Sequence, residues 1–501
     1  MSTPNTPLLI GGGQYKEQDI DPREASSPKQ MMREAAHLAA INAGLDPAVL
    51  AQLDLVITTK SVSDPTENPP EALANALASK HAKTWHCSTG GNSPQWLVNR
   101  VCEQIARGEV EFVLLAGVEA LDALTRAAKA GIDLDWTVPT QTSVQLLFPE
   151  RPSVSAQEEA HGLAPPVNTY PLFEQAIRGH CGRSLREHQA ALGELCAPFT
   201  EVAAEHPCAW FRTVRTAEEI ATATSTNRYV GFPYTKFMNA MINVNQSAAV
   251  LLCSEAFAQQ HGVAQNRKVY LHGCGDCNDH WNVLDRVNYH SSPAIRRVAS
   301  STLGMANIDI NDIDFIDLYS CFPSAVEIGR NMFGIPPDDP RPLTVTGGLP
   351  YFGGPGNNYV MHSIATMLDK VREHPGSFGL VTGNGWYITK HSAGVYSTNP
   401  VPDNWERTAP NTDQAAVDAE PGPEVVAQPT GAGNVETYTV LFGRDGAPHR
   451  GIVIGRTANG QRFIAVTPGD VPMLEQICAN EFLGATGAVS QRDGLNLFVP
   501  S

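Results

Sequence analysis

The chain has 501 residues, 42% of them hydrophobic, so it can bury a large core divided over two to four domains. Its formal net charge of −17 at pH 7 argues against general binding to nucleic acid or to an anionic membrane, because basic surfaces recognise both. The sequence contains no apolar run of about 18 residues and its first residues do not resemble a signal peptide, so we expect a cytoplasmic protein. In that setting the ten cysteines are expected to be reduced thiols.

Strand-like and helix-like segments alternate along the first 120 residues. Strand patterns at 8–13, 53–59, 83–89 and 111–120 are separated by helical patterns at 27–44, 72–80 and 93–110. The first helix should begin at Ser27, with Pro28 in its first turn, and end at Gly44, since these residue types favour helix ends. Such alternation is typical of a mainly parallel sheet covered by helices.

The alternation stops between residues 125 and 226, where proline-containing turns surround two helical runs at 171–182 and 184–206. This segment is predicted to be an insertion, and insertions in α/β enzymes commonly cover a site. The alternation then resumes, with a strand and helix at 242–262, a strand at 268–275, a helix at 292–306 and a strand, turn and helix at 312–335. We therefore expect a second α/β half.

The last hundred residues have a different composition. Residues 401–434 hold few large apolar residues and five prolines, which is typical of a linker: Pro402, Pro410, Pro421, Pro423 and Pro429. Strand-like runs then follow at 436–442, 450–456 and 461–468, a helix at 471–482, and final strands at 487–491 and 495–501. This order predicts a small β-barrel with one helix, similar to an OB-fold.

Four segments are distinctive: NRYVGFPYTKFMNAMINVNQSAAVLLCS (227–254), FIDLYSCFPSAVEI (315–328), VTGGLPYFGGPG (345–356) and LVTGNGWYITKHS (380–392). They resemble, in turn, the opening of the second thiolase half, the strand and turn of the HDCF or NEAF motif, the GG…GHP segment and the CxG loop. The chain thus resembles the thiolase superfamily and its sterol carrier protein X-type members. Within these, it is most similar to thiolase-like proteins of type 1, which carry an additional C-terminal domain.

The resemblance implies an α/β fold with a five-layered αβαβα core of two similar halves, an inserted loop domain and a small C-terminal β-barrel-like domain. The expected ranges are 1–124 for the N-terminal half, 125–226 for the loop domain, 227–400 for the C-terminal half, 401–434 for the linker and 435–501 for the β-domain. It also implies a coenzyme A thioester as substrate or ligand, with no permanently bound cofactor. No metal is expected, because the CxxC within HGCGDCNDH (272–280) lacks a second ligand pair at zinc-site spacing.

Thiolases use a nucleophilic cysteine, an activating histidine, a second cysteine as acid and base, and an oxyanion hole. The resemblance places the nucleophile position on Gly91, about five helical turns before Gly108. The HDCF histidine falls on Tyr319, the GHP histidine on Gly354 and the CxG cysteine on Gly383. Four catalytic positions therefore hold replaced residues.

Cys87 lies four residues before Gly91 and is the candidate nucleophile if the intervening loop absorbs the offset. The alternative for Cys87 is a buried packing thiol. Tyr319, together with Tyr351 or Tyr359, resembles the tyrosines that some thiolase-like lyases are thought to use as acid and base. The alternative for each tyrosine is a half-buried aromatic whose hydroxyl bonds to the backbone.

Four glycines of the family's motifs are retained and are expected to shape the ligand-binding site: Gly347, Gly348, Gly353 and Gly385. Three functions stay open. The first is an acyl-CoA-handling acyltransferase of lipid metabolism, similar to an acetyl-CoA acetyltransferase, with divergent or reduced chemistry. The second is a tyrosine-dependent retro-aldol lyase acting on acyl-CoA, and the third is a non-catalytic acyl-CoA-binding scaffold. A homo-oligomer through the core and a partner protein bound by the C-terminal domain both agree with the resemblance.

Overall fold

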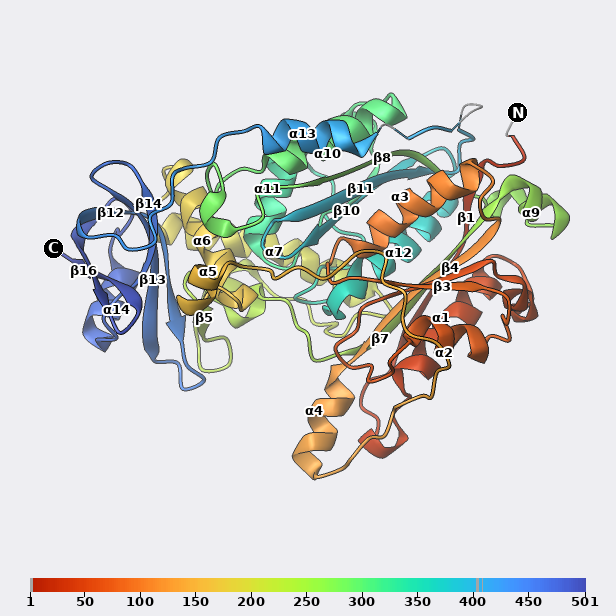
Figure 1. The fold of residues 1–501 in the computed structure, drawn as a ribbon, viewed down its shortest axis with the longest axis horizontal. Helices are drawn as coiled ribbons and strands as arrows, with labels where there is room; N and C mark the ends of the chain where they lie inside the picture. Colours follow the sequence, from red (N-terminus) through yellow and green to blue (C-terminus); the bar gives the residue numbers. More distant parts are fainter. Residues whose placement is uncertain (1–2, 402–404, 408) are drawn as a thin grey trace.

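The computed structural model describes residues 3–401, 405–407 and 409–501 (Figure 1). Its first sheet has the strand order β1-β7-β4-β2-β3. The strands are β1 (Pro7–Lys16), β2 (Leu55–Thr59), β3 (Lys83–Cys87), β4 (Phe112–Ala120) and β7 (Asn245–Ser254). β2 runs parallel to β3 and β4, whereas β7 runs antiparallel to both of its neighbours.

The second sheet repeats the pattern of the first, without the outermost strand. Its order is β8-β11-β10-β9, made by β8 (Tyr270–Asn278), β9 (Phe315–Asp317), β10 (Phe378–Gly385) and β11 (Lys390–Ser397). β9 and β10 are parallel, and β11 runs antiparallel to both of its neighbours, as β7 does in the first sheet. The prediction of two similar halves is confirmed.

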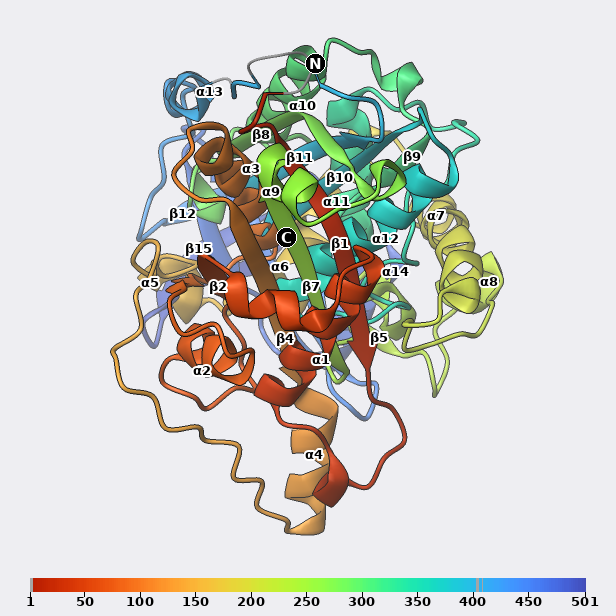
Figure 2. The ribbon, with the colours of Figure 1, turned by 90° about the vertical axis from the view of Figure 1, so that its right-hand side faces the viewer.

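Helices form three layers around the two sheets (Figures 1 and 2). α1 (Pro28–Asn42) and α2 (Pro69–Ala76) cover the outer face of the first sheet. α3 (Ser93–Ala106) and α12 (Tyr359–Glu373) lie between the sheets and contact both of them. α10 (Pro293–Ala306) covers the outer face of the second sheet, with α11 (Pro323–Phe333) beside it. This is the predicted αβαβα core.

The first helix shows how closely the layers pack. The Ser27 Oγ accepts a hydrogen bond from the Gln30 N–H, and the Gln30 Oε1 accepts one from the Ser27 N–H, so α1 begins where expected. Its buried stripe faces β1, where a Cβ at Gly11 would lie 2.0 Å from the Ala39 carbonyl oxygen. The GGG run of β1 is therefore needed for helix packing.

The inserted segment supplies α4 (Leu121–Ala130), α5 (Ala156–Ala160), α6 (Pro166–His180), α7 (Leu185–Glu205) and α8 (Ala217–Ala221). Part of it covers the outer edge of β3. There the His86 N–H donates to the Gln145 carbonyl at 2.9 Å, and the Leu147 N–H donates to the His86 carbonyl at 3.0 Å. The edge strand of the first sheet is thus paired within the chain.

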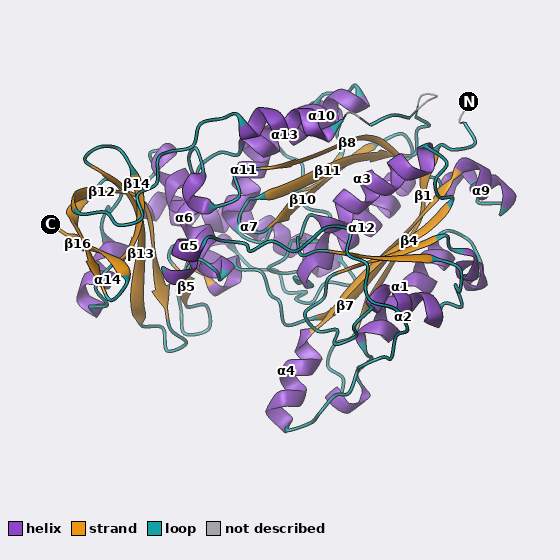
Figure 3. Cartoon of the chain, in the orientation of Figure 1, coloured by secondary structure: helices purple, strands orange, loops and turns teal. Residues whose placement is uncertain are grey.

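A closed five-stranded barrel stands at one end of the molecule (left in Figures 1 and 3). Its strands are β12 (Gly431–Phe442), β13 (Pro448–Thr457), β14 (Arg462–Val466), β15 (Thr486–Arg492) and β16 (Leu495–Pro500), with α14 (Val471–Ala479) between β14 and β15. β12 pairs with both β13 and β15, and the ring closes through β14 and β16. The predicted β-barrel with one helix is confirmed.

Several elements do not follow the predicted ranges, since α4 spans the limit at 124/125 and β12 spans the limit at 434/435. β7 falls within 227–400 but completes the first sheet, because the chain returns antiparallel between β1 and β4. From the same range come β5 (Tyr229–Gly231) and β6 (Tyr234–Thr235), which extend the barrel sheet through β12, and α9 (Glu255–Gln260). α13 (Pro410–Asp418) lies within the predicted linker, since a proline suits the first turn of a helix. Pro402 lies outside the described residues, and the domain limits themselves stay predictions.

The barrel is attached to the core through buried arginines. Arg462 of β14 is 0% exposed and makes two hydrogen bonds to the Glu436 carboxylate, at 2.9 and 2.5 Å. Its third nitrogen donates to the Leu284 carbonyl at 2.8 Å and to the Arg286 carbonyl.

Among the described residues, no helix has the length and apolar content that a membrane span requires.

Candidate active site

The two central helices bring their N-terminal ends together. The turn before α3 contacts the turn before α12, where the Gly90 N–H donates to the Asn357 Oδ1 at 2.8 Å. Neither Asn92, which precedes α3, nor Asn358, which precedes α12, caps its helix through its side chain. The helix dipoles favour negative charge at these ends, so this place suits an anionic or carbonyl group.

Tyr319 fills the space next to the start of α3. It follows β9 by two residues and is 9% exposed, and its N–H donates to the Thr382 Oγ1 at 2.9 Å. A Cβ at Gly91 would lie 2.3 Å from the Tyr319 hydroxyl oxygen and 2.5 Å from the Asn384 carbonyl oxygen. The tyrosine thus takes the volume that a side chain at position 91 would need, and the two replaced positions are sterically matched.

The cavity lined by Tyr319 and Gly383 has a volume of about 20 Å³. That is room for about one water molecule, whereas small-molecule pockets usually measure about 300–1,000 Å³. Burial, with Cys321 and Tyr359 nearby, raises the pKa of Tyr319 well above the ordinary phenol value. The hydroxyl therefore stays protonated at neutral pH and can donate a proton or a hydrogen bond.

The other replaced positions differ in how much room surrounds them. A Cβ at Gly383 would lie 2.8 Å from the Asn92 Cα, so this position also requires glycine. At Gly354 the nearest atom to an added Cβ is 3.5 Å away, which is ordinary contact. The backbone around the site thus leaves room for a side chain at Gly354 and not at Gly91 or Gly383.

The four retained glycines lie in the loop before α12 and at the end of β10. Gly347, Gly348 and Gly353 have φ values of +106°, +77° and +112°, a region where glycine is strongly favoured. A Cβ at Gly385 would lie 2.7 Å from the Asn92 Oδ1, which places Gly385 against the start of α3. A ligand-binding role for these four glycines stays a prediction.

Cys87 lies in the apolar core at the end of β3 and is 0% exposed. Burial raises the pKa of its thiol to about 11, although Ser93 and Lys390 act in the opposite direction. A nucleophilic cysteine needs the thiolate form, which is scarce at neutral pH for such a thiol. The environment of Cys87 is thus that of a packing residue, while its catalytic role stays a prediction.

The two further tyrosines are buried and surrounded by different groups. Burial raises the pKa of Tyr351, whose hydroxyl lies beside Cys196 of α7. The Tyr359 hydroxyl forms a 2.6 Å hydrogen bond with the Thr346 Oγ1, and its ring packs edge-on against Tyr319 at 5.8 Å. Tyr359 therefore supports Tyr319 structurally, and the catalytic role of Tyr351 stays a prediction.

Two residues that the sequence did not single out, Tyr170 and Asn384, complete the surroundings of Tyr319. The Asn384 Nδ2 donates to the Tyr170 hydroxyl at 2.9 Å, and that hydroxyl donates to the Trp386 carbonyl at 2.6 Å. Tyr170 comes from α6 of the inserted segment, so only the three-dimensional packing brings it here. Asn384 lies between two glycines of the CxG-like loop, which is the signal that could have identified it.

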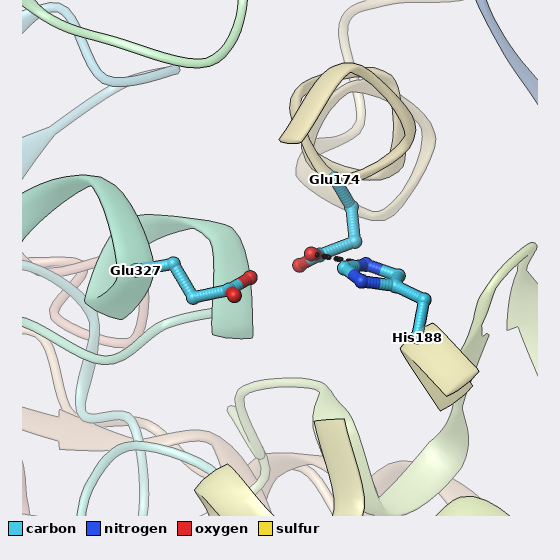
Figure 4. Close-up of side chains that lie close together, drawn as sticks. All are labelled: Glu174, His188 and Glu327. Carbon is cyan, nitrogen blue, oxygen red and sulfur yellow. Dashed lines mark hydrogen bonds and ion pairs between the residues drawn. The ribbon is translucent and has the colours of Figure 1, made fainter. Parts of the chain in front are cut away.

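A second cluster of ionisable groups lies where α6, α7 and α11 meet (Figure 4). The His188 Nε2 donates to the Glu174 Oε1 at 2.8 Å, and the Tyr234 hydroxyl donates to the Glu174 Oε2 at 2.6 Å. Glu327 points toward this pair, and its buried Oε2 has no hydrogen-bond partner among the described residues. Burial lowers the pKa of His188 to about 4 and, together with Glu174, raises the pKa of Glu327 well above its usual value. His188 is therefore neutral at pH 7, while Arg183, 3.5 Å from the Glu327 carboxylate, acts against the rise in the pKa of Glu327.

Glu327→Gln is expected to stabilise the protein at pH 8. Because the folded-state pKa of Glu327 is raised, the native chain holds a proton that the unfolded chain releases, so stability falls as the pH rises above the unfolded value. Glutamine removes this loss, by about 1 kcal/mol or more at pH 8, and the gain should shrink toward pH 5. Urea denaturation at pH 5 and at pH 8 measures this gain in the free energy of unfolding. Glu205→Gln, at an exposed glutamate of α7, is the control and should change the stability by no more than about 0.5 kcal/mol at either pH; equal gains in both variants would contradict the assignment.

Together, the repeated sheets, the central helices and the site at their N-termini define a protein of the thiolase fold. The crystal structure of a monomeric SCP2-thiolase like protein type 1 from Mycobacterium smegmatis is 34% identical, and the alignment covers 100% of both chains with a TM-score of 0.87. The sequence profile described as the thiolase-like protein type 1 additional C-terminal domain matches residues 413–494. This chain belongs to the SCP2-thiolase-like proteins of type 1.

More distant structures share the fold alone. The Ltp2-ChsH2(DUF35) aldolase is 17% identical over 79% of this chain and 98% of its own, with a TM-score of 0.59. An acetyl-CoA acetyltransferase from Syntrophomonas wolfei is 14% identical over 78% of this chain and 99% of its own, with a TM-score of 0.56. No curated protein sequence matches the chain.

Proposed function

We propose that this chain uses the thiolase fold to bind an acyl-CoA ligand and does not perform cysteine-dependent acyl transfer. The Tyr319 hydroxyl carries the proposal, because it occupies the space that a nucleophilic side chain at position 91 would need. The burial and raised pKa of Cys87 support the same conclusion. The choice of acyl-CoA rests on the shared fold with an acetyl-CoA acetyltransferase.

Calorimetry with acetyl-CoA and acetoacetyl-CoA, run beside an assay for released coenzyme A, tests this proposal. We expect binding of at least one thioester and no turnover of either. Coenzyme A release that disappears in Cys87→Ala would overturn the non-catalytic part. Absence of any binding would overturn the ligand assignment.

A tyrosine-dependent lyase is the second candidate. In this candidate the protonated Tyr319 hydroxyl, next to Gly91, would donate a hydrogen bond or a proton to the oxygen of a thioester. A relative of the same fold is described as an aldolase. This candidate predicts cleavage of β-hydroxyacyl-CoA compounds that falls by about 10²-fold or more in Tyr319→Phe. Lack of cleavage of both linear and branched compounds would remove it.

We propose that the chain is a monomer in solution. An open edge strand can pair with a second sheet, but the outer edge of β3 already pairs with residues 145–147. The M. smegmatis relative is itself described as monomeric. Light scattering after size exclusion should give a single species near 53.9 kDa, and a stable dimer would contradict this. A partner protein on the barrel, a cytoplasmic location and a role in lipid metabolism stay predictions.

A further inference from the structure

A cavity of about 610 Å³ lies beside the turn that precedes α3. It is larger than the cavity beside Tyr319, which measures about 20 Å³. We call it the α3 pocket and define it by Ser88, Asn92, Lys390 and four aromatic residues, Trp96, Phe148, Trp281 and Trp386. Its volume is that of a typical small-molecule site. The cavity beside Tyr319 shares none of these residues.

Lys390 supplies a buried ammonium to the α3 pocket. Lys390 is 8% exposed, donates to the Thr89 carbonyl and lies 5.8 Å from the centre of the Phe148 ring. Among the described residues it forms no ion pair within 4.0 Å, and burial lowers its pKa. The nearby Glu150 is engaged by Lys60 at 3.0 Å and by Thr89. A buried ammonium without a counter-ion is costly, so an anionic ligand would be favoured here.

Two more polar groups of the pocket lack partners. The Ser88 Oγ and the Asn92 Oδ1 are buried, and neither has a hydrogen-bond partner among the described residues. The N-terminus of α3 beside them has no side-chain cap, which adds a favourable potential for negative charge. Buried polar atoms are normally satisfied, so these groups also point to a ligand.

Aromatic rings form the rest of the wall. The Trp96 and Phe148 rings pack edge-on at 5.1 Å, and the guanidinium of Arg151 lies 4.2 Å from the centre of the Trp281 ring. Trp386 stands in the turn between β10 and β11 with φ of +57°. Arg286 holds this turn by donating to the Tyr387 carbonyl at 3.0 Å and the Ile388 carbonyl at 2.5 Å. The turn that carries Trp386 is therefore anchored by Arg286, which lowers the entropic cost of placing a ligand against this ring.

We propose that the α3 pocket binds a small organic anion with a flat aromatic body, of the class of aromatic carboxylates. The carboxylate would pair with Lys390 and accept from Ser88, while the ring would lie between the tryptophans. The cations Lys390 and Arg151 outnumber the single carboxylate of Glu150 among the lining residues, which matches a monoanion. This inference does not depend on the proposed acyl-CoA binding.

Calorimetry with 1-naphthoate and its neutral counterpart 1-naphthalenemethanol tests the inference on the full chain. We expect Lys390→Met to weaken naphthoate binding by about 10-fold or more and to leave the alcohol unaffected, since a charge-assisted contact is lost. Lys80→Met, at an exposed lysine outside the lining, is the charge-matched control. Trp281→Ala should weaken both compounds.

Failure of the wild-type protein to bind naphthoate at millimolar concentration would overturn the inference. So would equal naphthoate affinities in Lys390→Met and Lys80→Met. Because neither compound carries coenzyme A, these outcomes are independent of the acyl-CoA measurements.

Discussion

Arg462→Ala is expected to destabilise the protein by about 3–5 kcal/mol, the usual cost of removing one partner of a buried charge pair. The guanidinium is fully buried and satisfies the Glu436 carboxylate together with the Leu284 and Arg286 carbonyls. Alanine would leave all three acceptors without this donor. Urea denaturation followed by circular dichroism measures the loss in the free energy of unfolding.

Arg456→Ala is the matched control for this variant. Arg456 pairs with the same Glu436 carboxylate at 2.7 Å, but its side chain is 29% exposed and Arg462 remains in place. Partly exposed ion pairs contribute about 0–1 kcal/mol. If Arg456→Ala lowered the free energy of unfolding as much as Arg462→Ala, the burial of Arg462 would not explain its contribution to stability.

Gly91→Ala is expected to lower the free energy of unfolding by about 1–3 kcal/mol. The reason is that an added Cβ would lie 2.3 Å from the Tyr319 hydroxyl oxygen and 2.5 Å from the Asn384 carbonyl oxygen. In a Tyr319→Phe background the cost should be smaller, since the nearest atom is removed. A double-mutant cycle in urea measures this coupling.

Gly354→Ala provides the comparison at a second replaced position. Its added Cβ would have no neighbour closer than 3.5 Å, so a change of about 0.5 kcal/mol or less is expected. If Gly91→Ala were as mild as Gly354→Ala, Tyr319 would not fill the position that we assign to it.

Much of the fold could be predicted from the sequence because its signals are local. The Ser27 cap, the Gly44 end of α1 and the regular spacing of apolar runs report directly on the elements. The place of β7 could not be predicted this way, because partner choice in a sheet depends on the whole topology. The helix that begins at Pro410 could not be predicted either, since a proline suits both a linker and the first turn of a helix.

The candidate site could be predicted only in part. Motif positions pointed to Gly91, Tyr319 and Gly383, and the structure brings these three together around the start of α3. The steric match between Gly91 and Tyr319 was not foreseeable, because it depends on side-chain direction across more than two hundred residues of chain. Lys390 was missed as well, since a lysine at the start of a strand is ordinarily exposed, and only its burial makes it unusual.

Peptide mass spectrometry after incubation with acetyl-CoA tests the central claim most directly. The claim is that Tyr319 occupies the nucleophile position and that Cys87 is a buried, protonated thiol. We predict that the native protein carries no acetyl group on the peptide containing Cys87, at any time during the incubation. An acetyl group on Cys87 that is lost on adding coenzyme A would contradict the account.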